Sequence, residues 1–154
     1  MNSKQLLLEN VAGVYQWLDE QINGNDSRRE KCSACGTCCN FAKFDHRLYI
    51  TSPELIFFKE KLGSKPERMD GDACPYNENG KCTVYENRFA GCRIFFCRAD
   101  ADFQNQLSES AVRKFKRMCL VFDIPYRYVD LKQALNESIS NICLSDAEQP
   151  AAGR

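Results

Sequence analysis

The stretch KCSACGTCCN, residues 31–40, constrains this chain more than any other, because it places four cysteines within eight positions. These are Cys32, Cys35, Cys38 and Cys39. Two C-x-x-C steps share Cys35, and the last cysteine is doubled. Thiolates separated by two residues on a tight turn can converge on one metal centre, and Gly36 can adopt a positive φ there at no steric cost. The spacing therefore predicts a metal-chelating loop.

A second group of cysteines follows later in the chain: Cys74, Cys82, Cys92 and Cys97. The gaps between them are seven, nine and four residues, so this group lacks the paired C-x-x-C knuckles that are common in structural zinc sites. C-x2-C-x2-C is the spacing that bacterial ferredoxins use for an iron–sulfur cube, and a Cys-Pro supplies a further ligand in those proteins. Here Cys74 precedes Pro75. The pattern favours a 4Fe–4S cluster, with zinc as the alternative.

The doubled cysteine has a geometric interpretation. Successive side chains on an extended backbone point in opposite directions. We therefore expect Cys38 to complete an arc with Cys32 and Cys35, while Cys39 faces the second group. The eight thiols would then form one joined set of metal ligands, with a second metal site beside the cluster as a further option.

Disulfide bonding is the other explanation for many cysteines, and it depends on the compartment. The chain has ten cysteines in 154 residues, and a chain of that length can form an apolar core without covalent staples. Its N-terminus lacks a secretory layout, because the apolar run at residues 6–8 is followed at once by Glu9. We expect a cytoplasmic protein whose thiols serve as ligands. Disulfides, free thiols and export by a leaderless route stay open as alternatives.

Charge and hydropathy narrow the class of partner. Lys+Arg and Asp+Glu both count 21, so the net charge favours neither nucleic acid nor an anionic membrane. No run of apolar residues reaches the roughly 18 that a membrane span needs. The basic run RKFKR, residues 113–117, lies on a predicted helix that also carries acidic residues, so we expect a solvated face, with an acidic partner as the alternative. The expected partner is a protein, either a binding partner or a substrate.

A metal held by four thiolates leaves negative charge to be offset. Arg93 and Arg98 each follow a cysteine directly and are the candidate cofactor-binding cations. The two cysteines outside both groups, Cys119 and Cys143, lie on predicted apolar helix faces, where we expect buried small hydrophobes. We expect the single histidine, His46, to be a surface or core residue, with a role as one metal ligand or as an acid/base as the alternative. The sequence identifies no catalytic residue.

The periodicity of apolar residues and the capping residues at helix ends predict a mainly α fold in one domain, residues 1–154. An amphipathic helix is expected over residues 4–22 and two helices over residues 105–143, with Asp130 as the cap of the last one. Thr51 and Glu54 match a capping box for a helix that closes at Gly63.

The centre should contain little regular structure. We expect turns over residues 63–80, a short strand over 81–85 and one helical turn before Gly91. Residues 31–98 would form a cysteine-rich metal-binding region that metal, rather than a sheet, organises between the terminal helices. Aromatic residues near the second group are expected to pack in the core, with shielding of a cluster from water as the alternative: Tyr76, Tyr85, Phe89, Phe95 and Phe96.

Residues 32–39, the helix-forming SPEL, CPYNENGKCTVYENR and CRIFFC together resemble the CxxCxxCC family of zinc- or iron-chelating proteins. The resemblance covers roughly residues 31–98 and implies that all eight cysteines are ligands. Family members are described as iron–sulfur or zinc binding, and a related cysteine region occurs in a flagellin lysine methylase. This chain departs from the family pattern at Phe89 and Phe96, where proline is usual. Those changes alter turn rigidity rather than the ligands.

Three hypotheses follow from the sequence. The first is an iron–sulfur protein that transfers electrons or assists the modification of a partner. The second is a structural zinc module that mediates protein–protein interaction without catalysis. The third is an enzyme that acts on protein side chains, for which the sequence contains no cosubstrate-binding motif.

Overall fold

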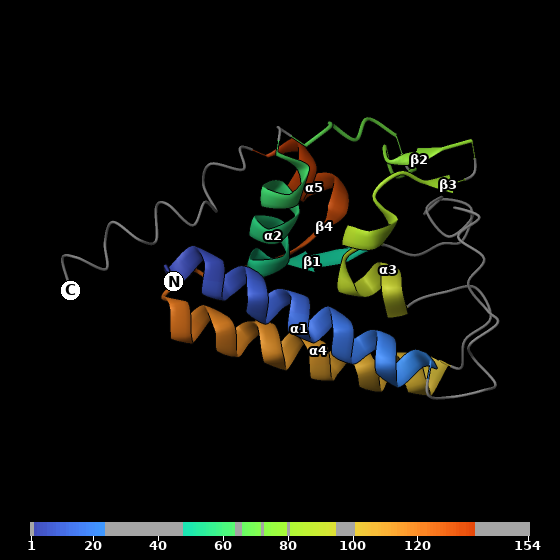
Figure 1. Ribbon diagram of the computed structural model, residues 1–154. Helices are drawn as coiled ribbons and strands as arrows, with labels where there is room; N and C mark the ends of the chain where they lie inside the picture. Colours follow the sequence, from blue (N-terminus) through green and yellow to red (C-terminus); the bar gives the residue numbers. More distant parts are fainter. Residues whose placement is uncertain are drawn as a thin grey trace.

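The computed structural model describes residues 2–23, 48–63, 66–71, 73–79, 81–94 and 101–137 (Figure 1). This part of the chain is mainly helical and contains only short strands, which confirms the predicted fold class. Whether the cysteines form its centre is a prediction that stays open, because residues 31–40 lie outside the described ranges.

Two long helices form one layer of the fold. α1, Ser3–Asn23, and α4, Ala101–Phe122, lie side by side and run in opposite directions (Figure 1). α1 buries the apolar stripe that its sequence predicts, with Leu7, Val11 and Leu18 fully inaccessible to solvent. α4 begins earlier than the expected residue 105, and it ends as predicted, where Asp123 adopts a positive φ of 57°.

α2, Ser52–Leu62, is the helix that its local sequence predicts most completely. Thr51 and Glu54 form the capping box, Pro53 lies in the first turn, and Gly63 ends the helix in the left-handed conformation at φ 68°. Seven of its eleven residues are buried, including Glu54, so the helix is enclosed rather than amphipathic. An acidic side chain in the interior needs hydrogen-bond donors around it.

A short antiparallel pairing connects distant parts of the chain. β1, Tyr49–Thr51, pairs with β4, Tyr128–Asp130, with Ile50 opposite Val129. β4 continues directly into α5, Leu131–Asn136, whose first turn is capped by Asp130 through a hydrogen bond from the Gln133 backbone N–H of 2.8 Å. The cap confirms the prediction, whereas the strand pairing was not expected from the sequence.

The second cysteine group lies in a region of short elements. β2, Asn77–Glu78, and β3, Lys81–Cys82, form a hairpin, and the 3-10 helix η2, Tyr85–Asn87, leads to α3, Ala90–Ile94. The strand is shorter than the predicted range 81–85. The predicted helical turn before Gly91 is confirmed as η2, and the separate helix α3, which includes Gly91, was not predicted. A Cβ at Gly91 would collide with Leu48 Cδ1, so α3 packs very closely against the residue that precedes β1.

Two clusters of buried side chains hold these elements together. The first lies where α1, α3 and α4 meet and includes Leu7, Leu18 and Phe115. The second joins α2, β1 and α5 to the hairpin region and includes Phe58 and Leu131. Each fully buried side chain of this size contributes about 1.5–3 kcal/mol from the removal of apolar surface from water. Among the helices of the described residues, none is long and apolar enough to cross a membrane.

Cys119 is the one cysteine outside the two groups that the structure describes, and it is buried in the first cluster at 4% exposure. This burial agrees with its predicted role as a small hydrophobe. We expect Cys119→Ala to lower the free energy of unfolding by about 1 kcal/mol, because it removes only one buried sulfur atom. Denaturant unfolding measures this loss, and the metal content should be unchanged.

The Cys119 thiol also makes stability depend on pH. Burial raises the pKa of Cys119 from 9.0 to about 11, so the folded protein retains a proton that the unfolded chain releases. The free energy of unfolding is therefore expected to fall as pH rises from 9 towards 11. Cys119→Ala should flatten this decline in denaturant titrations. An equal slope in both proteins would assign the pH dependence to other groups.

Candidate metal centre

Three of the eight predicted ligands lie in the described part of the chain, and each occupies a different kind of element. The Cys74 carbonyl accepts the Asn77 backbone N–H at 3.1 Å, which places Cys74 at the turn that enters the hairpin. Cys82 lies on β3, opposite Asn77 in the ladder. Cys92 lies in α3. All three side chains are partly exposed, so each thiol lies at the border between core and surface.

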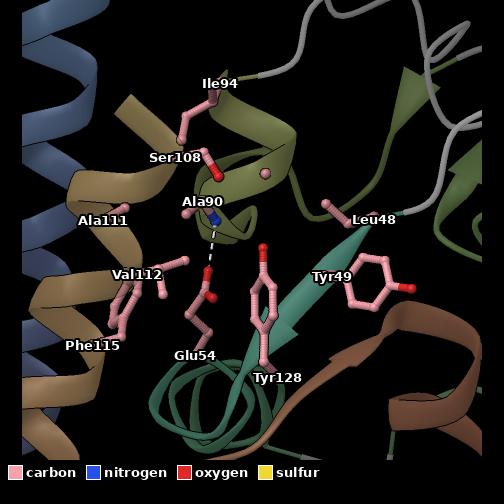
Figure 2. Close-up of a pocket in the computed structure, with 11 residues that line it drawn as sticks. Leu48, Tyr49, Glu54, Ala90, Ile94, Ser108, Ala111, Val112, Phe115 and Tyr128 are labelled. Atoms are coloured by element: carbon pink, nitrogen blue, oxygen red, sulfur yellow. Dashed lines mark hydrogen bonds between the residues drawn. The ribbon is translucent and has the colours of Figure 1, made fainter. Parts of the chain in front are cut away.

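Glu54 determines where α3 begins, and with it the position of Cys92. Its Oε1 accepts the backbone N–H of Ala90, the first residue of α3, at 2.6 Å. Its Oε2 accepts the Thr51 backbone N–H at 3.0 Å and the Thr51 hydroxyl at 2.9 Å. Figure 2 shows the carboxylate pointing from α2 towards Ala90. One buried side chain therefore caps α2 and fixes the start of α3.

A phenol from α1 completes this arrangement. The Tyr15 hydroxyl donates to Glu54 Oε1 at 3.3 Å. Burial raises the pKa of Glu54, and the donors that surround the carboxylate oppose that rise. Burial is the largest of the causes that raise the pKa of Tyr15 well above its ordinary value. The nearby Glu54 carboxylate and Cys92 raise this pKa further. The network thus reaches the neighbourhood of the Cys92 thiol.

Arg93, a predicted cofactor-binding residue, makes its described contacts within the protein. Its Nη1 pairs with Asp19 Oδ2 of α1 at 2.8 Å, and its Nε and Nη2 donate to the carbonyls of Arg88 and Glu86 at 3.0 and 2.8 Å. The guanidinium also lies 4.3 Å from the centre of the Tyr15 ring. These contacts attach α3 to α1 and to the segment before it. A role for Arg93 towards a bound metal stays a prediction.

Arg88 contacts the helix that carries Cys92, although the sequence pattern did not indicate this residue. Its Nη1 donates to the Cys92 carbonyl at 3.4 Å, and its guanidinium stacks 3.7 Å from the centre of the Tyr85 ring. The Arg88 side chain thus connects η2 to the helix that carries Cys92. The sequence signal was its position four residues before Cys92, which is weak in a segment without regular helix.

Two of the aromatic residues near the second group pack in the core, as expected. The ring of Phe58 lies 5.3 Å from that of Tyr76 and 4.7 Å from that of Phe89. Tyr76 and Phe89 are 5% and 4% exposed, so both are packing residues of the second cluster. The same prediction was wrong for Tyr85, whose side chain is on the surface at 36% exposure. Shielding of a metal cluster by these rings stays a prediction, and Phe95 and Phe96 lie outside the described residues.

The other predicted site residues lie outside the described ranges: Cys32, Cys35, Cys38, Cys39, Cys97 and Arg98. The same holds for His46 and Cys143. Within the described ranges, no three His, Cys, Asp or Glu side chains gather closely enough to hold a metal ion. The structure thus places Cys74, Cys82 and Cys92 and leaves the complete set of ligands as a prediction.

A cavity of about 200 Å³ lies beside the Glu54 network (Figure 2). Apolar side chains of α4 and α3 form much of its wall, and Ser108 and Tyr128 contribute hydroxyl groups. Glu54 is the only charged side chain among the described residues that line it, and both of its oxygens already accept hydrogen bonds from the protein. We therefore assign Glu54 a structural role rather than a role in binding a molecule in the cavity.

The chemistry of the predicted donors suits zinc or iron. Both metals bind cysteine thiolates, and soft sulfur ligands select them over magnesium or calcium. The three described cysteines, Cys74, Cys82 and Cys92, are each partly exposed. Each is supported by the hairpin or by α3, whose backbone hydrogen bonds and side-chain contacts reduce the number of conformations that binding would have to order.

Comparison with known protein families agrees with this assignment. The sequence profile described as "Putative zinc- or iron-chelating domain" matches residues 31–120, more than half of the chain. No curated protein and no solved structure matches the chain. The matched segment includes both cysteine groups, the capping box of α2 and most of α4. The chain therefore belongs to the CxxCxxCC family of zinc- or iron-chelating domains.

Proposed function

We propose that the eight cysteines hold an iron–sulfur cluster of the 4Fe–4S type and that the protein transfers electrons or assists the modification of a protein partner. The observation that carries the proposal is the run C-x-x-C-x-x-C-C, followed by four further cysteines within one family segment. The first three cysteines have the spacing with which ferredoxins hold a cube. We place the protein in the cytoplasm, where thiols stay reduced.

Apart from the three described cysteines, the residues around the site would support the ligands rather than take part in the chemistry. Glu54 and Arg93 fix α3, and with it the backbone of Cys92. The β2–β3 hairpin fixes the backbone positions of Cys74 and Cys82. When bound, an iron–sulfur cluster supplies a one-electron redox couple whose potential depends on hydrogen bonds to sulfur and on solvent exposure. Partly exposed ligands are compatible with electron exchange with another protein.

The alternative is a structural zinc module without catalysis. The family description names zinc as well as iron, and zinc held by four thiolates would order the central loops on its own. In that case the ordered loops would present a surface to a protein partner. The two proposals share the cysteine ligands and differ in redox activity.

Anaerobic purification followed by reduction separates the two proposals. We expect a brown protein whose visible absorbance decreases on addition of dithionite and returns on reoxidation. A colourless protein that contains stoichiometric zinc and shows no change with dithionite would contradict the iron–sulfur proposal and support the zinc module. Elemental analysis of the same sample identifies the metal.

A further inference from the structure

A long groove runs between α1 and α4, on residues that take no part in the contacts around Cys92. Its volume is about 880 Å³, more than four times that of the cavity beside Glu54. Gly13 lines the groove from an exposed position in the middle of α1. A Cβ at this position would meet no atom within 4 Å, so packing does not require glycine there. Glycine costs a helix interior about 0.5–1 kcal/mol relative to alanine, so helix stability does not explain glycine on this wall of the groove either.

The floor of the groove is apolar and partly exposed. Val14 and Trp17 line it from α1, and Met118, Val121 and Phe122 line it from α4. Val121 is 70% exposed, whereas Val14 and Met118 are buried at 7%. A large exposed apolar residue at the edge of a buried floor is common where a partner side chain completes the packing.

The groove also carries a concentration of positive charge. Arg113, Lys114 and Arg117 line it, and among the residues that the structure describes Glu9 is the only acidic one that does so. The Lys114 Nζ lies 4.5 Å from the centre of the Trp17 ring. Among the described residues, no acidic side chain forms an ion pair with any of these three cations. In a chain with zero net charge, this is a local excess that an acidic partner would neutralise.

We propose that the groove between α1 and α4 binds an acidic amphipathic helix of a partner protein. Apolar side chains of that helix, at i, i+3, i+4 and i+7, would pack on Val14, Trp17 and Val121. Carboxylates that flank the apolar stripe would lie beside Arg113 and Arg117. An apolar floor favours a protein segment over nucleic acid, whose binding depends chiefly on phosphate contacts. The proposal does not depend on the metal that the cysteines hold.

The single tryptophan of the chain reports directly on the groove, because Trp17 lines it. The probe is a synthetic helical peptide without tryptophan, with leucine at i, i+3, i+4 and i+7 and glutamate on both flanks. Titrated into the full-length protein, it should shift the Trp17 fluorescence with a micromolar Kd. The affinity should fall as salt is added, because the flanking charges are solvent-exposed. A peptide with glutamine in place of glutamate should bind at least ~10-fold more weakly.

Variants test whether peptide binding depends on the charges and the shape of the groove or is non-specific. Arg113→Glu combined with Arg117→Glu should weaken binding at least ~10-fold, whereas Lys132→Glu, an exposed charge reversal on α5, should not. Gly13→Leu should fill the groove and abolish binding. Gly13→Ala is its matched control, which should raise helix stability and reduce binding far less. Unchanged far-UV circular dichroism would confirm that both Gly13 variants fold.

Three results would overturn the proposal. The first is the absence of a fluorescence shift at millimolar peptide. The second is equal binding by the Gly13→Leu or Arg113→Glu/Arg117→Glu variants. The third is stronger binding by single-stranded DNA than by the peptide, measured through the same tryptophan, because it would assign the cations to a nucleic acid.

Discussion

Replacing Glu54 by alanine is expected to lower the free energy of unfolding by about 3–5 kcal/mol. The substitution removes the acceptor of the Thr51 and Ala90 backbone N–H groups and of the Tyr15 and Thr51 hydroxyls, at a side chain that is only 2% exposed. Each buried donor without an acceptor costs about 1–3 kcal/mol. A domain of this size is stable by only about 5–15 kcal/mol, so the variant should be close to unfolding. Urea titration measures the loss.

Glu54→Gln provides a graded control for the same site. Glutamine keeps the shape and one acceptor oxygen, but its amide group would meet the Thr51 backbone N–H instead of accepting from it. We expect a loss of about 1–3 kcal/mol. Glu60→Ala, which removes a partly exposed ion pair with Lys4, should cost less than about 1 kcal/mol. Similar losses for the Glu54 and Glu60 variants would contradict the assignment of Glu54 as the anchor of α3.

Replacing Cys82 by serine is expected to remove most of the bound metal while the helices stay folded. Cys82 lies on the short strand β3 and is partly exposed, so its sulfur contributes little packing. Loss of residues that merely support a ligand lowers metal affinity by about 10–100-fold, and loss of a ligand itself should lower it by at least as much. Metal analysis after dialysis against a chelator measures retention.

Variants of two further cysteines show whether the loss of metal is specific to the predicted ligands. Cys39→Ser should lose metal to the same extent, because the doubled cysteine is predicted to join the two groups. Cys119→Ala should retain all of it, because Cys119 is buried in the helical core. Full retention by Cys82→Ser would return Cys82 to a structural role. Loss of helical signal in step with the metal would show that folding, rather than ligation, had been disturbed.

Much of the helical fold could be predicted from the sequence, because the start, end and buried face of a helix depend mainly on residues close together in the chain. The stripe of α1, the capping box at Thr51 and the cap at Asp130 are local patterns with local causes. The pairing of Tyr49–Thr51 with Tyr128–Asp130 was not predicted, because three-residue strands carry almost no periodic signal. Nearly eighty residues also separate the two strands in the chain.

The role of Glu54 shows why the site could be predicted only in part. Its match to a capping box identified the hydrogen bond to Thr51, and nothing in the local pattern indicated that the same carboxylate also holds Ala90 and Tyr15. Those contacts depend on three segments meeting in the core. The cysteines are the opposite case, because their spacing indicates metal chemistry before any fold is known. The family match supports that chemistry.

The most direct test of metal binding by the eight cysteines is a thiol titration combined with metal analysis of anaerobically purified, full-length protein. We expect stoichiometric iron with acid-labile sulfide, or stoichiometric zinc in the alternative. The thiols of both groups should react with a disulfide reagent only after a chelator has removed the metal. Protein that contains neither metal in stoichiometric amount, and whose group thiols react at once, would contradict it.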